Sequence, residues 1–497
     1  MNSNSTNKIG FTAIAESASD LRADTLAQLP DEVDAVKIRA DLLPKVDPDE
    51  LRQRFRGELL YSLRSREFEG SPSERIRRIK EAARVYDLIE FEFPGDLAPE
   101  TLAAAPPEKR ALVWRGGPTT ATGLRRRFEE MKTIPARRYR LTAEALSHTD
   151  SLQPLLFLKQ LQRDDTVAFA SGPFGAWTRF IAPLLGGANV SGVVATNPRP
   201  DAIPVRQLVQ SLSRLGPPAE LFGFIGSSVF KSPSPSLHNA AYRALDYPGV
   251  YVPFYTENFA SFWRELANNP DFHSLGLPLR GMTIAAPHKE SVLAFADDIT
   301  DSAHQAQSAN LVYRRQGRWL ADSTDAMGIA ELLKERDIDP HDRKIAVIGC
   351  GGSGRAMALQ LSRSGARVSL VNRNLKRGEH AESLLDLPLL SAPNLDCSQF
   401  DIVVNATPVG GNGETHSFSL ENLHPELTVV DLVYRERDAT PLIAAARQAG
   451  CATIDGSAML RVQVRQQFRL MTSRNMPNAA FDEVLRPNAE TRSQAMR

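Results

Sequence analysis

Apolar runs and helical stretches alternate through about the first two hundred residues of the chain. Runs rich in β-branched and aromatic residues predict strands at residues 8–15, 34–43, 58–64, 86–93, 110–116, 137–142 and 166–172. Between them, residues 73–84, 121–131 and 150–162 place apolar side chains at helical spacing. Strand–helix alternation of this kind is typical of a parallel sheet covered by helices. About eight strands in roughly 210 residues predict a TIM-barrel-like (β/α)8 domain in an α/β protein.

A proline-rich break separates this region from a second unit. Residues 211–220 carry Gly216-Pro217-Pro218, where both prolines lack a backbone donor and restrict the preceding residue. A new apolar run begins at Leu221, and a third unit opens near Lys344. We expect three domains in the 497 residues: a barrel at 7–214, a second domain at 220–326 completed by a C-terminal helix at 460–488, and a third domain at 327–459.

Charge and cysteine content narrow the class of protein. Lys and Arg number 59, as do Asp and Glu, so no global basic field predicts a nucleic acid or a membrane as partner. The three cysteines have neither metal-ligand spacing nor the even count of a disulfide framework, and we expect no metal. The N-terminus lacks the apolar segment of a signal peptide, and no apolar run reaches about 18 residues. These features predict a cytoplasmic enzyme.

The third unit opens with a glycine-rich turn between a strand and a helix. Residues 344–349 form an apolar strand, the turn at 349–354 is GCGGSG, and the helix RAMALQLSRSG and the strand RVSLVNRN follow. Gly349 permits the tight turn, Gly351 lets the backbone approach a pyrophosphate, and Gly354 lets the helix pack against the strand. The helix N-terminus offers free N–H groups to phosphates. A G-x-G-x-x-G in this context predicts a dinucleotide site.

The end of the second strand of this unit indicates which dinucleotide binds. Sites for NAD usually place Asp or Glu there to accept from the ribose hydroxyls. This chain has Asn372 and Arg373 instead, with Lys376 and Arg377 close behind. A cation without a carboxylate suits a 2′-phosphate, so the sequence predicts NADP rather than NAD.

Four blocks in the second half of the chain match the motifs of one family in collinear order. They are GSSVFKSPSPSLHN at 226–239, GMTIAAPHK at 281–289, residues 309–325 ending in STD, and GSAMLRVQ at 456–463. About 270 residues of this chain therefore resemble shikimate dehydrogenase. The resemblance implies a two-lobed α/β enzyme with a Rossmann NADP-binding domain. It also implies the interconversion of 3-dehydroshikimate and shikimate, a step of chorismate and aromatic amino acid biosynthesis.

The resemblance assigns roles to individual residues. Lys289 is expected to be the general acid/base, and Asp325 to orient it and bind the same substrate hydroxyl. The other residues implied for the substrate are Ser232, Ser234, Asn310, Thr324, Tyr434 and Gln463. Those implied for the cofactor are Gly349, Gly351, Gly352, Ser353, Gly354, Asn372, Arg373, Lys376, Asn405, Thr407 and Gly456.

The chain departs from the family pattern near the expected substrate. Lys231 stands where the family often has His, and Ala285 stands where it supplies a Thr hydroxyl. Thr283, Leu311 and Ser323 replace the usual Asn or Ser, Thr and Asn. A lost hydroxyl at position 285 costs about 1 kcal/mol for a typical hydrogen bond. These departures leave shikimate and quinate open as substrates.

About the first 210 residues resemble type I 3-dehydroquinate dehydratase. The matching segments are KIRADLL at 37–43, YSLRSR at 61–66, residues 87–92 and SGPFGAWTR at 171–179. The resemblance places Arg39, Arg64 and Arg179 at family positions. Together with Arg115 and Arg140, they are expected to line the barrel mouth and to bind an anion.

Two residues that the dehydratase chemistry requires are replaced. That family condenses a Lys amine with the substrate ketone, and a His shuttles the proton. Arg140 stands at the Lys position and Arg115 at the His position, while Lys37 replaces a Glu. Ala202 and Arg206 replace a Ser and a Gln in the last loop. An Arg with a pKa above about 12 offers neither a free nucleophile nor a proton at neutral pH, so we expect a barrel without dehydratase activity.

Three hypotheses remain open at this point. The first is a shikimate dehydrogenase fused to a silent barrel, which the intact Lys289 and Asp325 favour. The second is a fully bifunctional dehydratase–dehydrogenase, against which Arg115 and Arg140 count. The third is a ligand-sensing protein without catalysis, against which the intact dinucleotide fingerprint counts. The sequence also leaves a homodimer open.

Overall fold

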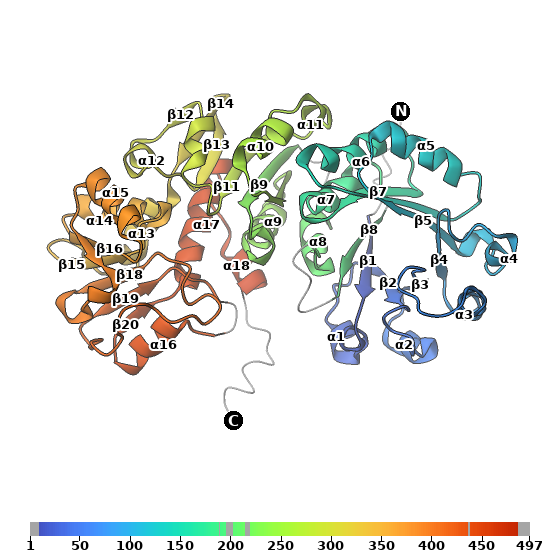
Figure 1. Cartoon of the computed structure of the whole chain (residues 1–497), viewed down its shortest axis with the longest axis horizontal. Helices are drawn as coiled ribbons and strands as arrows, with labels where there is room; N and C mark the ends of the chain where they lie inside the picture. The colour runs from blue at the N-terminus through green and yellow to red at the C-terminus, as the bar shows by residue number, and fades with distance from the viewer. Residues whose placement is uncertain (1–8, 188, 195–201, 214–218, 436–437, 486–497) are drawn as a thin grey trace. The chain divides into compact units, whose positions relative to one another are not determined.

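The computed structural model describes residues 9–187, 189–194, 202–213, 219–435 and 438–485. The predicted break at Gly216-Pro217-Pro218 lies outside these residues. The chain forms two compact units (Figure 1). Unit 1 comprises Met1–Phe222 and Ser228–Leu279, and unit 2 comprises Gly223–Ser227 and Arg280–Arg497. Unit 1 is therefore larger than the barrel that the sequence predicts.

The first part of unit 1 is a nearly closed barrel of parallel strands, as predicted. Within the described residues, eight strands pair in the order β7-β6-β5-β4-β3-β2-β1-β8. They are β1 (Gly10–Ala15), β2 (Val33–Arg39), β3 (Glu58–Ser62), β4 (Leu88–Glu92), β5 (Arg110–Gly116), β6 (Arg138–Glu144), β7 (Thr166–Ser171) and β8 (Asn189–Val193). Helices that include α3 (Pro72–Val85), α5 (Ala121–Met131), α6 (His148–Leu161) and α8 (Val205–Leu212) cover the sheet (Figure 1).

The predicted helix at 73–84 shows how local signals set these elements. Ser71 caps α3 by accepting a hydrogen bond from the Glu74 amide at 3.1 Å, and Pro72 fits the first turn. One face of the helix is buried and includes the Arg75 side chain, which donates to Asp96 Oδ2 at 2.9 Å. A buried charge needs such a partner, so this arginine belongs to the barrel core.

Unit 1 continues beyond the barrel and shares a core with it. The continuation includes α9 (Ser234–Ala244), β10 (Gly249–Tyr255), α10 (Phe259–Phe262) and α11 (Pro270–Ser274). The buried Trp177 ring lies 5.2 Å from Phe254 and 6.0 Å from Phe272, between ring centroids. His148 Nε2 lies 3.1 Å from Thr256 Oγ1, and both residues are buried. The barrel and residues 228–279 thus pack as one body.

A mixed sheet carries the first lobe of the second half of the chain. In the described residues its strands run in the order β10-β9-β11-β13-β14-β12. Besides β10, they are β9 (Glu220–Gly226), β11 (Leu279–Ile284), β13 (Leu311–Arg315), β14 (Arg318–Asp322) and β12 (Asp298–Ile299). Strand β13 runs antiparallel to both β11 and β14.

The second lobe is a parallel sheet with the strand order of a Rossmann fold, as predicted. Among the described residues the order is β17-β16-β15-β18-β19-β20. The strands are β15 (Lys344–Ile348), β16 (Arg367–Asn372), β17 (Leu389–Ser391), β18 (Ile402–Asn405), β19 (Thr428–Asp431) and β20 (Ala452–Ile454). Helices α14 (Gly352–Arg363), α15 (Leu375–Leu385) and α16 (Pro441–Gln448) pack on it through two apolar clusters. A ligand site is expected where the strand order reverses, between β15 and β18.

The C-terminal segment differs from the single helix expected at 460–488. It forms α17 (Gly456–Thr472) and α18 (Asn478–Leu485), with a break between them. Ser473 adopts a left-handed conformation with φ of 57°, which ends α17, and Pro477 precedes α18. No helix in the described ranges is long and apolar enough to cross a membrane.

Candidate active site

The glycine-rich turn has the backbone that close approach to a phosphate requires. Gly349 has a φ of 102°, in the left-handed region that favours glycine. A Cβ on Gly354 would lie 1.8 Å from the Gly349 carbonyl oxygen, so a side chain there would separate α14 from the turn. Around Gly351, the nearest side-chain atom to such a Cβ is an Arg377 guanidinium nitrogen at 3.7 Å. The turn therefore fits a pyrophosphate at the N-terminus of α14.

The polar end of β16 lies against this turn. The Asn372 side chain accepts a hydrogen bond from the Cys350 amide at 3.2 Å and donates to the Asn374 carbonyl at 2.6 Å. Arg373 and Lys376 are exposed beside it. Arg377 donates to Glu290 Oε1 at 3.0 Å. The expected cofactor residues at 372, 373 and 376 thus lie at one end of the turn, where a dinucleotide ribose would be.

Lys289 and Asp325, the predicted catalytic pair, are in direct contact. Lys289 Nζ lies 2.7 Å from Asp325 Oδ2, and Gln463 Nε2 donates to Asp325 Oδ1 at 2.6 Å. The Asp325 side chain is 2% exposed and that of Lys289 is 18% exposed. The carboxylate is therefore fixed from two sides, while the ammonium group keeps access to a ligand.

Ser353 links the lysine to the glycine-rich turn. Lys289 Nζ donates a second hydrogen bond, of 2.7 Å, to Ser353 Oγ in the first turn of α14. This approach depends on Gly352, where a Cβ would lie 2.2 Å from Ser308 Oγ and 3.1 Å from Lys289 Cβ. The sequence predicts a cofactor role for Ser353, and that role stays a prediction; in the structure the Ser353 hydroxyl accepts a hydrogen bond from Lys289.

A chain of buried hydrogen bonds supports Asn310. Thr324 donates to Asn310 Oδ1 from its amide at 2.7 Å and from its hydroxyl at 3.1 Å. Gln467 donates to Thr324 Oγ1 at 3.1 Å and accepts from Thr283 Oγ1 at 3.0 Å. Thr324 is fully buried, and its hydroxyl holds Asn310 in position. Its contact with substrate stays a prediction. Asn310 has only its Nδ2 group to offer a ligand.

Asn405 and Thr407 form a rigid loop after β18. Asn405 Nδ2 donates to Asp431 Oδ1 at 2.9 Å, and its Oδ1 accepts from the Thr407 hydroxyl at 2.7 Å. Asn405 is fully buried and shapes the loop, and its role in cofactor binding stays a prediction. A Cβ on Gly349 would lie 2.7 Å from Thr407 Cγ2, so this loop borders the glycine-rich turn.

The remaining predicted residues lie at the starts of helices. A Cβ on Gly456 would lie 2.4 Å from the Val433 carbonyl group and 2.5 Å from the Tyr434 amide, so this glycine lets α17 begin against that backbone. In unit 1, Ser232 Oγ donates to Ser234 Oγ at 3.1 Å and accepts from the Ser234 amide at 3.2 Å. The two hydroxyls lie together where α9 begins.

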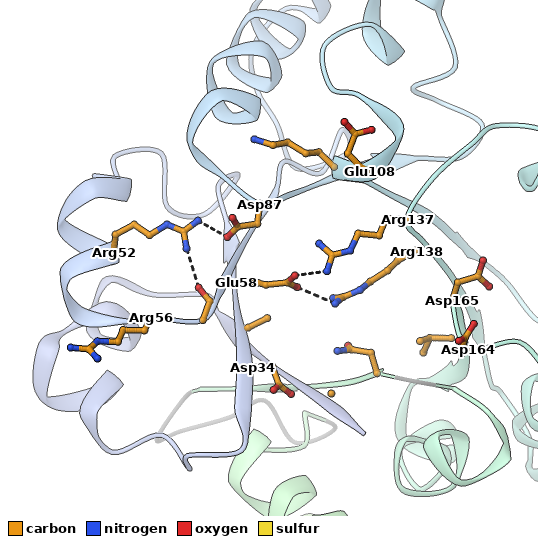
Figure 2. A pocket seen from close by; sticks show the side chains of 16 residues that line it. Asp34, Arg52, Arg56, Glu58, Asp87, Glu108, Arg137, Arg138, Asp164 and Asp165 are labelled. Atoms are coloured by element: carbon orange, nitrogen blue, oxygen red, sulfur yellow. Dashed lines mark hydrogen bonds and ion pairs between the residues drawn. The ribbon is translucent and has the colours of Figure 1, made fainter. Parts of the chain in front are cut away.

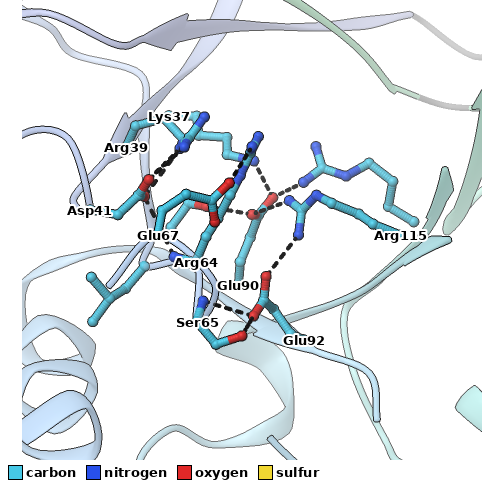
Figure 3. Close-up of polar contacts among 12 residues, drawn as sticks. Lys37, Arg39, Asp41, Arg64, Ser65, Glu67, Glu90, Glu92 and Arg115 are labelled. Atoms are coloured by element: carbon cyan, nitrogen blue, oxygen red, sulfur yellow. Dashed lines mark hydrogen bonds and ion pairs between the residues drawn. The ribbon is translucent and has the colours of Figure 1, made fainter. Parts of the chain in front are cut away.

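The barrel holds a buried ion-pair network where the dehydratase residues were expected (Figure 3). Lys37 Nζ donates to Glu90 Oε1 at 2.6 Å, and Arg115 donates to Glu90 Oε2 at 3.0 Å. Arg140 is ion-paired with the same Glu90 carboxylate. Arg140 and Arg115 thus stand on β6 and β5 at the expected places, and Glu90 on β4 joins them to Lys37.

The three arginines of the predicted anion site, Arg39, Arg64 and Arg179, contact other groups of the barrel. Arg39 is paired with Asp41 at 2.5 Å and Glu16 at 3.2 Å. Arg179 donates to the Ser191 carbonyl at 2.9 Å, and its guanidinium lies 4.4 Å from the Phe169 ring centroid. Arg39 and Arg179 therefore stabilise the wall of the barrel. Arg64 is ion-paired with Glu67 at 3.6 Å, a separation beyond hydrogen-bond distance.

A second charged cavity, of about 920 Å³, lies at the opposite end of the barrel strands (Figure 2). Its ion pairs join Glu58 to Arg137 at 2.5 Å and to Arg138 at 3.0 Å, and Arg52 to Asp87. Active sites of such barrels form at the carboxyl ends of the strands, whereas this cavity is lined by strand starts such as Gly10 and Glu58. Glu58, Asp87 and three of the arginines of this cavity are thus paired with one another.

Comparison with known proteins identifies the second half of the chain. Residues 224–312 match the family model of the shikimate dehydrogenase substrate binding domain. Residues 344–434 match that of the coenzyme F420-dependent NADP oxidoreductases. The chain is 34% identical over 259 residues to a protein named shikimate dehydrogenase (NADP(+)) from Thermococcus kodakarensis, covering 51% of this chain and 90% of that one. This chain belongs to the shikimate dehydrogenase family.

The dehydrogenase is fused to a type I 3-dehydroquinase domain, which residues 11–217 match. A chloroplastic protein of Arabidopsis thaliana named bifunctional 3-dehydroquinate dehydratase/shikimate dehydrogenase is 27% identical over 344 residues, or 64% of this chain and 56% of that one. The crystal structure of shikimate dehydrogenase from Aquifex aeolicus is 26% identical, covering 54% of this chain and 98% of that one with a TM-score of 0.49.

One residue of the shikimate dehydrogenase site and one residue of the barrel network have only weak signals in the sequence. Gln467 lies one helical turn after Gln463 on α17, so the spacing of four residues puts both amides on one face. Glu90 is one of two acidic residues in β4, where four of the five residues are buried. Neither a helical Gln nor a strand Glu identifies its partner until the fold brings the two together.

Proposed function

We propose that this chain is an NADP-dependent shikimate dehydrogenase that interconverts 3-dehydroshikimate and shikimate. The contact between Lys289 and Asp325 carries the proposal. Relatives named shikimate dehydrogenase (NADP(+)) support the substrate and the cofactor. The reaction needs one group that exchanges a proton with the reacting oxygen and one site that holds a dinucleotide, and unit 2 contains residues suited to both.

Lys289 exchanges the proton in this proposal. Its ammonium group has three protons, of which one is donated to Asp325 and one to Ser353. The third remains for the carbonyl oxygen of 3-dehydroshikimate, which gains negative charge as it is reduced. In the reverse direction Lys289 accepts the hydroxyl proton of shikimate. Asp325 keeps the ammonium beside that oxygen, and Gln463 prevents the carboxylate from rotating.

The cofactor residues fit NADP. When bound, NADP supplies or accepts the hydride at nicotinamide C4. The backbone of the turn at 349–354 and the N-terminus of α14 bind the pyrophosphate. Arg373 binds the 2′-phosphate, because the end of β16 offers a cation and an amide in place of a carboxylate.

Polar groups around the pair orient the substrate. Asn310 offers an amide N–H to a ring hydroxyl, since its oxygen is occupied by Thr324. Ser232, Ser234 and Tyr434 stay predictions for the substrate carboxylate. At position 285 the chain has no hydroxyl, and the Ala285 amide donates to the Ile225 carbonyl at 2.8 Å. The pocket therefore makes fewer polar contacts to substrate than the family pattern does.

The barrel is proposed to lack dehydratase activity. Schiff-base chemistry needs a neutral amine on β6, and Arg140 there is ion-paired with Glu90. Arg115 is likewise paired with Glu90 and with Glu92, at 3.0 and 3.3 Å. A guanidinium held by carboxylates neither attacks a ketone nor shuttles a proton at neutral pH.

The proposed activity is tested by following NADPH absorbance with shikimate or quinate as substrate, each with NADP and with NAD. Turnover with shikimate and NADP is expected, and Lys289→Ala is expected to abolish most of it while leaving NADP affinity unchanged. No turnover in folded protein would refute the proposal. For the barrel, borohydride is added with 3-dehydroquinate and peptides are mapped by mass spectrometry. A reduced adduct on any barrel lysine would show that the barrel still forms a Schiff base.

A further inference from the structure

The loop that follows β7 carries an aromatic side chain that contacts the dehydrogenase half of the chain. Phe174 is half-buried and lies in the short helix Pro173–Gly175. Its ring meets the ring of Tyr255, the last residue of β10, edge-on with 5.3 Å between the centroids. Phe174 lies in the segment that matches the dehydratase family and Tyr255 in the segment that matches the dehydrogenase family, yet both belong to unit 1.

Tyr255 extends this contact to a third ring. It stacks on Phe230 with an interplanar angle of 9° and 6.3 Å between the centroids. Aromatic pairs at such separations attract each other. Phe230 lies in the short helix Val229–Lys231, which Ser232 ends as its C-cap. The row of three rings thus leads from the barrel to the segment that carries Ser232 and Ser234, the serines predicted to bind the substrate carboxylate.

A second barrel side chain holds the residue after Tyr255. His148 Nε2 lies 3.1 Å from the Thr256 hydroxyl. That hydroxyl donates its single proton to the Asn258 carbonyl at 2.8 Å, so His148 is the donor of the hydrogen bond that joins it to Thr256. The His148 ring also meets Phe174 edge-on at 5.0 Å between centroids. The end of β10 is therefore held by two barrel residues that contact each other.

The segment before Ser232 has little rigidity of its own. The Lys231 amide donates to the Ser228 carbonyl at 3.5 Å. The Ser232 amide donates to the Val229 carbonyl over the same distance. Both are longer than a usual backbone hydrogen bond, and the helix they close has only three residues. Side-chain packing, including that of Phe230 on Tyr255, therefore contributes much of what fixes Ser232.

We propose that Phe174 of the barrel is a positioning residue for the dehydrogenase. It acts through the row of three rings to fix the Ser232 and Ser234 hydroxyls beside the substrate carboxylate. The inference rests on the proposed function, because it requires that these serines bind that carboxylate. It gives the barrel a part in the dehydrogenase reaction that needs no dehydratase chemistry. None of the three rings is predicted to bind the cofactor, so the effect falls on binding of the substrate.

Steady-state kinetics of the full chain with shikimate and NADP test this role. Phe174→Ala is expected to raise KM for shikimate about fivefold, as loss of an aromatic pair predicts. Values of kcat and of KM for NADP are expected to stay within about twofold of the parent, since the carboxylate contact is made equally before and during the reaction. Phe174→Tyr keeps the ring and is expected to match the parent. Phe68→Ala is the control, because this half-buried barrel ring packs against the Arg78 guanidinium, 5.4 Å from its centroid.

A double substitution shows whether Phe174 acts through Tyr255. In a chain that carries Tyr255→Ala the row is already broken, so Phe174→Ala is expected to change KM for shikimate by less than about twofold further. The inference would be overturned by an unchanged KM in Phe174→Ala, an equal rise in Phe68→Ala or in KM for NADP, or full additivity with Tyr255→Ala. Each of these results leaves the proposed function standing, because the parent still oxidises shikimate. A folded parent without turnover would overturn the proposed function and this inference with it.

Discussion

The hydrogen bond between Ser353 and Lys289 makes a specific kinetic prediction. In Ser353→Ala the backbone amide that faces the pyrophosphate remains, and only the hydroxyl that accepts from Lys289 Nζ at 2.7 Å is removed. The substitution therefore separates two roles of the glycine-rich turn, which are binding of the cofactor and positioning of the lysine.

The structure limits how large the effect should be. Hydrogen bonds to charged groups contribute about 1.5–3 kcal/mol. Lys289 is partly exposed and keeps Asp325, so water replaces part of the lost contact and the lower end of that range applies. About 1.5 kcal/mol of transition-state stabilisation corresponds to a fall in kcat of roughly 10- to 15-fold.

Steady-state kinetics with shikimate and NADP, measured across the pH range, would test this. The expected result is a lower kcat and a pH profile of kcat that differs from that of the parent. The KM values for both substrates are expected to stay within about twofold of the parent. Ser353→Thr, which keeps the hydroxyl, is expected to recover most of kcat. Ser362→Ala, near the other end of α14, is the matched control. If the loss appeared in KM for NADP with kcat unchanged, the hydroxyl would serve the nucleotide, and the reasoning would be wrong.

Three further substitutions test other parts of the molecule. Asp325→Asn removes the charge that holds Lys289, and we expect kcat/KM to fall about 100-fold or more, as is usual for acid–base groups; a loss below about tenfold would show that the carboxylate is dispensable. Arg373→Ser is expected to raise KM for NADP at least about tenfold while leaving KM for NAD unchanged, since only NADP has the 2′-phosphate; equal changes for both would contradict the assignment. Burial lowers the pKa of His148 to about 4, so the unfolded chain takes up a proton below about pH 6.5 while the folded protein stays neutral. The free energy of unfolding is therefore expected to fall by about 1.4 kcal/mol per pH unit as the pH drops from about 6.5 towards 4, and denaturant titrations of His148→Gln should lack that component; parallel curves for the two proteins would refute it.

The elements of the fold could be predicted because they depend on local pattern. The apolar runs of the barrel and the strand–turn–helix around Gly349 contain their own signals, namely periodicity, glycine and capping residues. The division at 460–488 was missed because a left-handed Ser473 has no sequence signature of its own. A residue other than glycine that ends a helix in this conformation is hard to recognise from the sequence alone.

The residues of the site could be predicted from the sequence, whereas most of their contacts could not. Lys289 and Asp325 were expected from their motifs, and their contact agrees with that expectation. The support of Asn310 by Thr324 and Gln467 joins three elements distant in sequence, which no local pattern reports. The same is true of Glu90, whose importance lies in the three cations that surround it.

The aromatic contact between Trp177 and Phe254 makes the dehydrogenase half depend on the barrel for part of its packing. These rings come from the two sides of the family boundary, yet they belong to one hydrophobic core. Each aromatic ring buries about 150–250 Å², so removal of the barrel would expose apolar surface of the dehydrogenase half to solvent. The barrel therefore contributes to the packing of the dehydrogenase half whether or not it catalyses a reaction of its own.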